Sequence, residues 1–190
     1  MKKLGFLMLL LALAVMLGGT ALAQGDNSDY FVTYYSNANT ANAPDATVRA
    51  VNDGDTENNL YASIYVFDDS EELTECCSCV ITPDGLLSES VNKNLTAAPL
   101  TGIKPTRGVI KIVSALEVMA PPTFNFEAYY GIRAWATHVQ KLTSGYSLTE
   151  TQFADSNLAS SEAELLVDLC RYDYLLSGQP CTCTPEDQDF

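Results

Sequence analysis

Short apolar runs separated by turn-forming residues dominate the hydrophobic pattern of this chain. The runs are rich in β-branched and aromatic residues, and clusters of Gly, Pro, Asn, Asp and Ser separate them. This pattern is typical of β-strands joined by turns, because such residues pack well on a pleated surface. The pattern predicts strands at 30–35, 47–52, 60–68, 76–82, 86–91, 107–114, 124–129 and 132–139.

One segment near the C-terminus has helical periodicity instead. Ser161 and Glu164 form a capping box, and apolar residues then recur at helical spacing until Gly178 and Pro180 end the pattern. We therefore expect a helix over 161–177. Its apolar stripe needs a partner, and the sheet is the available one.

The order of these elements predicts the fold class. Seven or more short strands followed by one helix fit a mainly β protein, a β-sandwich of immunoglobulin-like architecture stapled by disulfides, better than alternating βαβ units. The expected organisation is a signal peptide at 1–23, an N-terminal apolar strand with a flexible connector at 24–46, and the sandwich domain with its helix and cysteine tail at 47–190.

The N-terminus has the three parts of a secretory signal peptide. Lys2 and Lys3 precede an apolar run over 4–17, and Ala-Leu-Ala at 21–23 forms a cleavage site. The run is shorter than the roughly 20 residues that a spanning helix needs. We therefore expect cleavage before Gln24 and a secreted or periplasmic mature chain, with no membrane insertion after cleavage.

The composition is strongly acidic. Ten basic and 24 acidic residues give a formal net charge of −14, and loss of the two signal-peptide lysines changes it to −16. Nucleic acids and anionic lipids carry charge of the same sign, so neither is an expected partner. A protein partner or self-assembly is compatible with this surface, as are divalent cations and basic partners.

Six cysteines form two clusters of three, and an even number in an exported chain indicates disulfides. Pairing within the first cluster would strain the bridge geometry, so we expect the clusters to pair with each other. In a strand, the second and third cysteines of the first cluster share one face. An antiparallel match, one of six cross-cluster pairings, gives Cys77–Cys183, Cys79–Cys181 and Cys76–Cys170.

Metal binding is the alternative use of these cysteines. The C-x-C pairs at 77–79 and 181–183 offer four thiolates, which suit tetrahedral zinc or copper(I). Their spacing differs from the commoner C-x2-C, and an oxidising compartment favours cystine. The preferred interpretation is therefore disulfides with no cofactor.

An acidic loop offers a weaker metal hypothesis. Asp53, Asp55 and Glu57 match the first three ligand positions of a calcium loop, but Asn58 and Ile64 replace the Gly and Glu that such a loop requires. The preferred interpretation is a solvated turn between two strands, with a weak extracellular calcium site as the alternative.

No catalytic motif is present. The chain has one histidine, His138, and lacks the nucleophile, phosphate-loop and metalloprotease signatures. The acid pairs Asp68-Asp69 and Glu71-Glu72 are interpreted as turn residues. We therefore expect a protein without enzymatic activity and with no catalytic residues, and an unrecognised hydrolase is the third hypothesis.

The first expected strand is apolar on both faces and precedes an Asn/Ala/Ser-rich connector. The preferred interpretation is the first strand of the chain's own sheet. The alternative is a strand that pairs with the sheet edge of another subunit, since exposed edges accept added strands. The residues of this candidate partner strand are Tyr30, Phe31, Val32, Tyr34 and Tyr35.

Three segments of the chain resemble a group of other proteins. CCSCVITPDGL at 76–86, GVIK at 108–111 and RAWATH at 133–138 resemble uncharacterised exported bacterial proteins with a CC-x-C-x-x-TPDGL segment and a C-terminal C-x-C. The resemblance runs from about residue 47 to the C-terminus and implies no function. The sequence itself predicts a secreted, non-enzymatic module with a structural, adhesive or assembly role in the cell envelope or extracellular space. A metal-binding protein is the first alternative.

Overall fold

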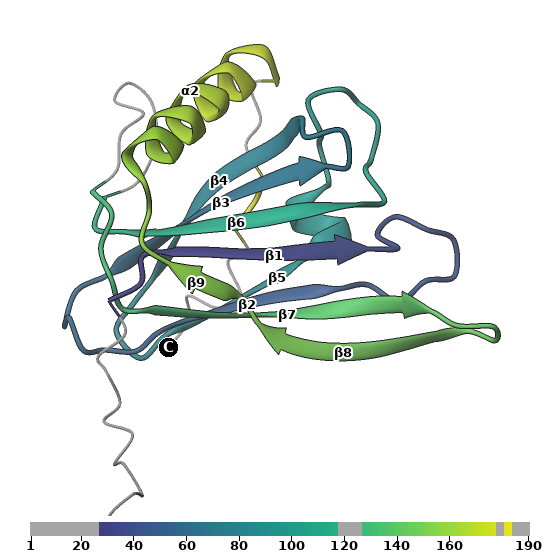
Figure 1. Cartoon of the computed structure of the whole chain (residues 1–190), viewed down its shortest axis with the longest axis horizontal. Coiled ribbons are helices and arrows are strands. Elements are labelled where there is room, and N and C mark those ends of the chain that lie inside the picture. The colour runs from purple at the N-terminus through teal and green to yellow at the C-terminus, as the bar shows by residue number, and fades with distance from the viewer. Residues whose placement is uncertain (1–26, 118–126, 178–180, 184–190) are drawn as a thin grey trace, which may run out of the picture.

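The structure, a computed structural model, describes residues 27–117, 127–177 and 181–183 of the 190-residue chain. Within these residues, nine strands form two antiparallel sheets, and one long helix follows them (Figure 1). The expected signal peptide and the first half of the strand expected at 124–129 lie outside the described residues. In the second half, Ala128 forms only an isolated bridge to Ala115, so the described residues form no strand there. The chain is therefore mainly β with one C-terminal helix, as its pattern predicts.

The five-stranded sheet has the order β4-β3-β6-β1-β9, and the four-stranded sheet has the order β5-β2-β7-β8. A short π-helix, η1, follows β5, and the long helix, α2, follows β9. The bounds are β1 (Tyr30–Ser36), β2 (Thr47–Asn52), β3 (Leu60–Asp68), β4 (Leu73–Ile81), β5 (Leu86–Ser90), η1 (Val91–Leu95), β6 (Arg107–Ala115), β7 (Ile132–Lys141), β8 (Tyr146–Gln152), β9 (Ala154–Ser156) and α2 (Ser160–Ser177).

The main core lies between the two sheets. Side chains alternate along each strand, so Ile64 of β3 and Ile110 of β6 point inward from one sheet while Ala50 of β2 and Ala134 of β7 point inward from the other. All four side chains are fully buried. This shared core holds the two sheets together.

A second, smaller core lies under α2, on the opposite face of the five-stranded sheet (Figure 1). Tyr65 of β3 and Val113 of β6 point outward from the sheet, and Leu166 and Cys170 of α2 pack against them. Burial of a side chain such as Leu166 contributes roughly 1.5–3 kcal/mol. The helix therefore covers the sheet, as its apolar stripe requires.

The aromatic run forms β1 inside the five-stranded sheet. β1 pairs with β6 along its whole length and with β9 over Tyr30 to Val32. Phe31 and Tyr35 are buried in the main core, and half of Tyr34 is exposed. In this structure the run is thus covered by strands of its own chain.

The structure confirms most expected strands and adds two. β4 begins at Leu73, three residues earlier than expected, because Leu73 pairs with Phe67 across a β-bulge. β8 and β9 were not predicted. Most side chains of these strands are exposed, so their sequences lack the alternation of apolar and polar residues that predicts a strand. Backbone pairing holds β8 to β7 and β9 to β1.

All six cysteines form disulfides between the two clusters, with Cα–Cα distances of 5.7, 5.1 and 5.5 Å. The predicted pairing of Cys76 with Cys170 is confirmed. The other two predicted pairs are wrong. The observed pairs are Cys77–Cys181 and Cys79–Cys183.

The error lies in the direction of the tail. The backbone N–H of Cys181 donates to the carbonyl of Cys76 at 3.3 Å, and Cys183 Sγ lies 3.4 Å from the carbonyl oxygen of Ser78. Residue numbers therefore rise together along β4 and the tail, which makes the tail parallel to β4. An antiparallel tail would have produced the predicted pairs.

None of the helices in the described parts of the chain combines the length and apolarity needed to cross a membrane.

The tail bridges should stabilise the protein less than their sequence separation of 104 residues suggests. Once Cys76–Cys170 is closed, the next bridge closes only a short additional loop. We expect the Cys181→Ser/Cys183→Ser variant to keep its β-signal and lose about 3 kcal/mol of unfolding free energy. Urea unfolding followed by circular dichroism measures both quantities.

Limited proteolysis provides the matching local measurement. The tail of the double variant should become cleavable while the strands stay protected. Global loss of β-signal at room temperature would instead show that the two sheets depend on the tail.

Candidate functional site

A groove of about 380 Å³ lies between α2 and the outer face of the five-stranded sheet. Such a volume is within the range of ligand-binding clefts. Four of the lining residues are apolar and three are charged. The lining residues are Phe67, Asp68, Glu71, Val109, Lys111, Leu165 and Leu169.

Strand alternation explains the floor of the groove. Phe67 in β3 and Val109 in β6 point outward because their neighbours, Val66 and Ile110, fill the main core. The two strands are paired directly, Phe67 opposite Val109. Gly108 permits this approach, since a Cβ atom there would lie 1.9 Å from the carbonyl oxygen of Phe67.

A polar cluster joins the first turn of α2 to the sheet beside the groove. Lys111 Nζ lies 2.7 Å from Glu162 Oε1, and the Tyr30 hydroxyl donates to the same oxygen at 2.9 Å. Burial raises the pKa of Glu162, but the hydrogen bonds from Lys111 and Tyr30 outweigh it, so the net direction is downward. Glu162 is therefore ionised at neutral pH and neutralises Lys111.

Lys111 also lies over an aromatic ring. Its Nζ is 4.7 Å from the centroid of Phe67, within the range of a cation–π contact. The one basic side chain that lines the groove is thus engaged by Glu162 and Phe67.

Helix α2 is apolar on two faces. Leu166, Cys170 and Asp173 form the buried face toward the sheet. A second row follows the positions i, i+4, i+7 and i+11 on the outer side of the helix. We call Leu165, Leu169, Tyr172 and Leu176 the outer stripe.

The outer stripe is largely uncovered by the described residues. Leu165, Tyr172 and Leu176 are 49%, 64% and 72% exposed, and the neighbouring Leu175 is 70% exposed. The stripe begins in the groove, where Leu165 and Leu169 form one wall. Groove and stripe together therefore make one continuous apolar surface along α2.

This finding corrects the sequence interpretation of the helix. The pattern treats Leu165, Leu166, Leu169, Cys170, Tyr172 and Leu176 as one stripe that covers the sheet. The structure divides them into two faces because Leu166 and Cys170 are buried against the sheet, whereas Leu165, Tyr172 and Leu176 are exposed. Leu169 lies at the boundary, since it is partly buried against the second core.

Acidic side chains surround the apolar surface. Asp68 ends β3, the following turn contains Asp69, Glu71 and Glu72, and α2 adds Glu162, Glu164 and Asp168. Three basic side chains lie among these seven acids, and each is in an ion pair. The pairs are Lys111–Glu162, Arg107–Asp69 and Arg171–Asp168.

Two buried carboxyl groups lie at the other end of α2. Glu75 in β4 is fully buried, and its Oε1 accepts from the backbone N–H of Ala98 at 2.7 Å. Asp173 in α2 is also buried, with Oδ2 3.6 Å from Cys76 Sγ. Neither group is open to a substrate, so this pair serves the packing of α2 and β4.

Burial, countered in part by the Ala98 N–H, raises the pKa of Glu75 to about 7. The charge of Asp173 raises it further, and the charge of Lys104 lowers it. The second oxygen, Oε2, is buried without a hydrogen-bond partner among the described residues. Both observations fit a Glu75 side chain that is protonated in mildly acidic solution.

His138 is buried in β7 rather than placed in a cleft. Its Nε2 lies 2.6 Å from Thr151 Oγ1 in β8, and its ring stacks on Tyr34 with centroids 4.1 Å apart. Burial lowers the pKa of His138, so the ring is neutral at pH 7. Its described contacts supply no carboxylate of the kind that orients a catalytic histidine.

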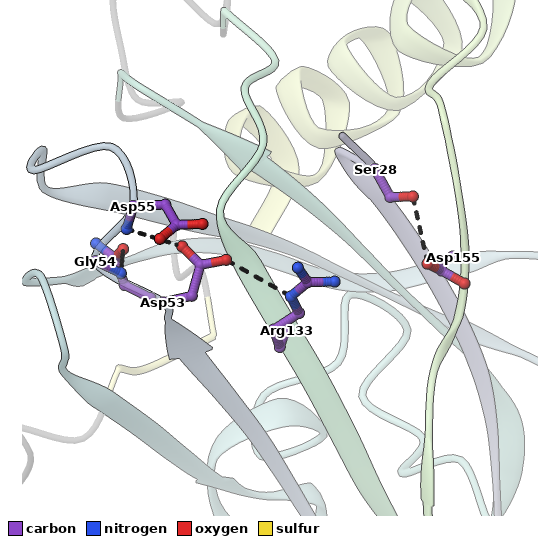
Figure 2. A network of polar contacts seen from close by, with 7 residues as sticks. Ser28, Asp53, Gly54, Asp55, Arg133 and Asp155 are labelled. Atoms are coloured by element: carbon purple, nitrogen blue, oxygen red, sulfur yellow. Dashed lines mark hydrogen bonds and ion pairs between the residues drawn. The ribbon is translucent and has the colours of Figure 1, made fainter. Parts of the chain in front are cut away.

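The acidic loop is a turn with internal hydrogen bonds and an ion pair to β7 (Figure 2). Asp53 Oδ1 accepts from the backbone N–H of Asp55 at 3.2 Å, and Asp53 Oδ2 lies 3.6 Å from Arg133 Nε. Ser28 and Asp155 form a separate contact of 3.3 Å in the same view. Both carboxylate oxygens of Asp53, the first expected calcium ligand, are thus already in contact with protein groups.

The tail disulfides bring several sulfur atoms together. The Sγ atoms of Cys77, Cys79 and Cys183 lie within 4.8 Å of one another. Each is bonded in a disulfide here, whereas metal ligation requires the thiolate. The cluster could act as a metal site only after reduction.

Glu75 should make stability depend on pH. Its pKa is raised from 4.5 to about 7 in the folded chain, so folding binds a proton between these values. The contribution of Glu75 to the unfolding free energy is therefore greatest below pH 4.5. It falls by at most about 3 kcal/mol as the pH rises to about 7. Urea unfolding from pH 4.5 to 8 should show a smaller decline for Glu75→Gln.

Glu164→Gln is the matched control, because it removes one negative charge from the exposed face of α2. An identical pH slope in the wild-type protein and in Glu75→Gln would contradict this account of Glu75.

Comparisons with known proteins give a weak likeness of fold. No protein-family model and no curated protein matches the chain. A crystal structure of Thermotoga maritima 1070 is similar to it, with a TM-score of 0.46 and 13% sequence identity. The match covers 72% of this chain and 99% of the Thermotoga maritima chain.

Proposed function

We propose that this chain is an exported, non-enzymatic module of immunoglobulin-like sandwich architecture that acts by binding another protein. The role is structural, adhesive or one of assembly, in the cell envelope or the extracellular space. The observation that carries the proposal is the apolar surface formed by the groove and the outer stripe.

The disulfides support the proposed location. Three bridges with no free cysteine fit an oxidising compartment outside the cytoplasm, where thiols are not kept reduced. They also fix the helix that presents the stripe, since Cys170 ties the middle of α2 to β4. A fixed surface loses little conformational entropy when a partner binds it.

Exposed apolar side chains on a solvated helix support the binding role. Scattered apolar residues are ordinary on protein surfaces, but contiguous patches mark interaction sites. Tyr172 lies at the centre of the outer stripe, between Leu169 and Leu176, and aromatic residues of this kind often anchor interfaces. The surface is thus of the type that a partner protein covers.

Site-specific photo-crosslinking tests this function. A photoreactive residue at Tyr172 in the expressing cell should give a discrete protein adduct, and one at Leu148 in β8 should give none. Both positions are more than half exposed, so accessibility is matched. The adduct should disappear when Leu165→Gln and Leu176→Gln are combined.

Unreduced mass and circular dichroism confirm that each variant is folded. Equal adducts from both positions, or none from Tyr172, would overturn the binding role of this surface.

A second candidate function is thiolate metal binding, favoured by the three sulfur atoms that lie within 4.8 Å. It requires reduced Cys77, Cys79 and Cys183, so it predicts reactive thiols in the secreted protein.

We expect the opposite result, because all six cysteines are bridged. Alkylation of unreduced protein should add no mass, and metal analysis of the same sample should find no stoichiometric zinc or copper. Two or more reactive thiols, or one bound metal per chain, would favour the metal function over the binding function.

A further inference from the structure

We infer, on the basis of the binding role proposed above, that the groove and the outer stripe take a cationic amphipathic polypeptide segment, with an apolar face and basic flanking residues. The apolar part of this ligand enters the groove, and its basic residues lie against the surrounding acids. Three observations carry the choice of this ligand class.

The first observation is the apolar interior of the groove. Phe67 and Val109 form its floor, and Leu165 and Leu169 form its wall. These side chains offer no hydrogen-bonding groups, so a polar or sugar-like ligand would lose its contacts with water without compensation. An apolar side chain is the group that this volume of about 380 Å³ accommodates well.

The second observation is the excess of acid around that interior. Seven carboxylates at the end of β3, in the β3–β4 turn and on α2 accompany three basic residues, all of which already have acidic partners. Glu71 lines the groove itself, and its side chain is exposed. A ligand with basic residues beside its apolar face meets complementary charge here, which favours both encounter and correct orientation.

Lys111 does not reverse this preference. Its ammonium group is 2.7 Å from Glu162 and lies over Phe67, so the groove presents no free cation to an acidic ligand. An acidic ligand would also approach a chain of net charge −14. The same charge disfavours a second copy of this chain as the occupant.

The third observation is the shape of the stripe. Leu165, Leu169, Tyr172 and Leu176 are spaced over three turns of α2, which corresponds to roughly 16 Å along the helix axis. A straight apolar row of this length matches the apolar face of another helix, the usual arrangement when an amphipathic helix binds a groove. The ligand is therefore a segment of at least three helical turns.

Binding of designed peptides to the unreduced mature protein tests this inference. Three peptides of about 18 residues, long enough for four helical turns or more, share one leucine face and carry Lys, Gln or Glu on the other. A fourth peptide has the lysine composition in scrambled order and lacks the apolar face. Fluorescence anisotropy measures the dissociation constants at low and high ionic strength.

We expect the lysine peptide to bind about tenfold more tightly than the glutamine peptide, with an affinity that falls as salt screens the charges. The glutamate and scrambled peptides should bind more weakly still. The Leu165→Gln/Tyr172→Gln variant should lose binding, and Leu148→Gln should bind as the wild type does. The Glu71→Gln/Glu164→Gln variant should bind the lysine peptide more weakly and the glutamine peptide as tightly as the wild type does.

Four outcomes would overturn the inference. Equal binding of the lysine, glutamine and glutamate peptides would show an apolar groove without charge preference, and equal binding of the scrambled peptide would show non-specific attraction. A sedimentation dimer that Leu165→Gln/Tyr172→Gln abolishes would make a second copy the occupant. Absence of peptide binding together with a Tyr172 crosslink would indicate a partner of other chemistry, and the binding function would remain.

Discussion

Side-chain alternation along β4 determines how α2 and the C-terminal tail attach to the sheets. Cys76 points to the outer face and bonds to Cys170 of α2, whereas Cys77 and Cys79 point into the main core and bond to the tail. One strand therefore holds the helix on one face and the tail on the other. The groove exists because the first of these attachments fixes α2 over Phe67 and Val109.

The five-stranded sheet supplies the side chains on the floor of the groove, and α2 gives the groove its shape. The sheets supply an outward row of residues, of which Phe67 and Lys111 are examples, and this row alone would be a flat surface. The helix converts the surface into a groove, and the Lys111–Glu162 pair fixes the end of the helix that forms the wall. The acids of the β3–β4 turn add negative charge, and one of them, Glu71, also lines the groove.

Local patterns in the sequence predict the elements that bury their side chains. β2 and β3 have the predicted bounds, and α2 differs by one residue from its predicted start, because apolar residues alternate or recur in each. β8 has no such pattern, since most of its side chains are exposed and it is held to β7 by backbone pairing. Pairing of the cysteines is predictable at the level of clusters, but the order within them depends on the direction of the tail.

The groove could not be predicted from the sequence because its floor, formed by β3 and β6, and its wall, formed by α2, come from segments far apart in the chain. Helical spacing identifies Leu165 and Leu166 equally as apolar positions. Which of them is buried depends on the side of α2 that the Cys76–Cys170 bridge turns toward the sheet. A partial signal was present: the apolar positions of α2 cover more than one face, which is more than a helix needs to cover one sheet.

The parallel tail also protects a vulnerable edge. β4 is the last strand on its side of the five-stranded sheet, and the N–H of Cys181 bonds to the carbonyl of Cys76 on that edge. Uncovered edge strands with apolar side chains readily pair with other chains. Because Cys181 follows β4 by a hundred residues, this edge stays open to aggregation during synthesis until the tail has emerged and its bridges have formed.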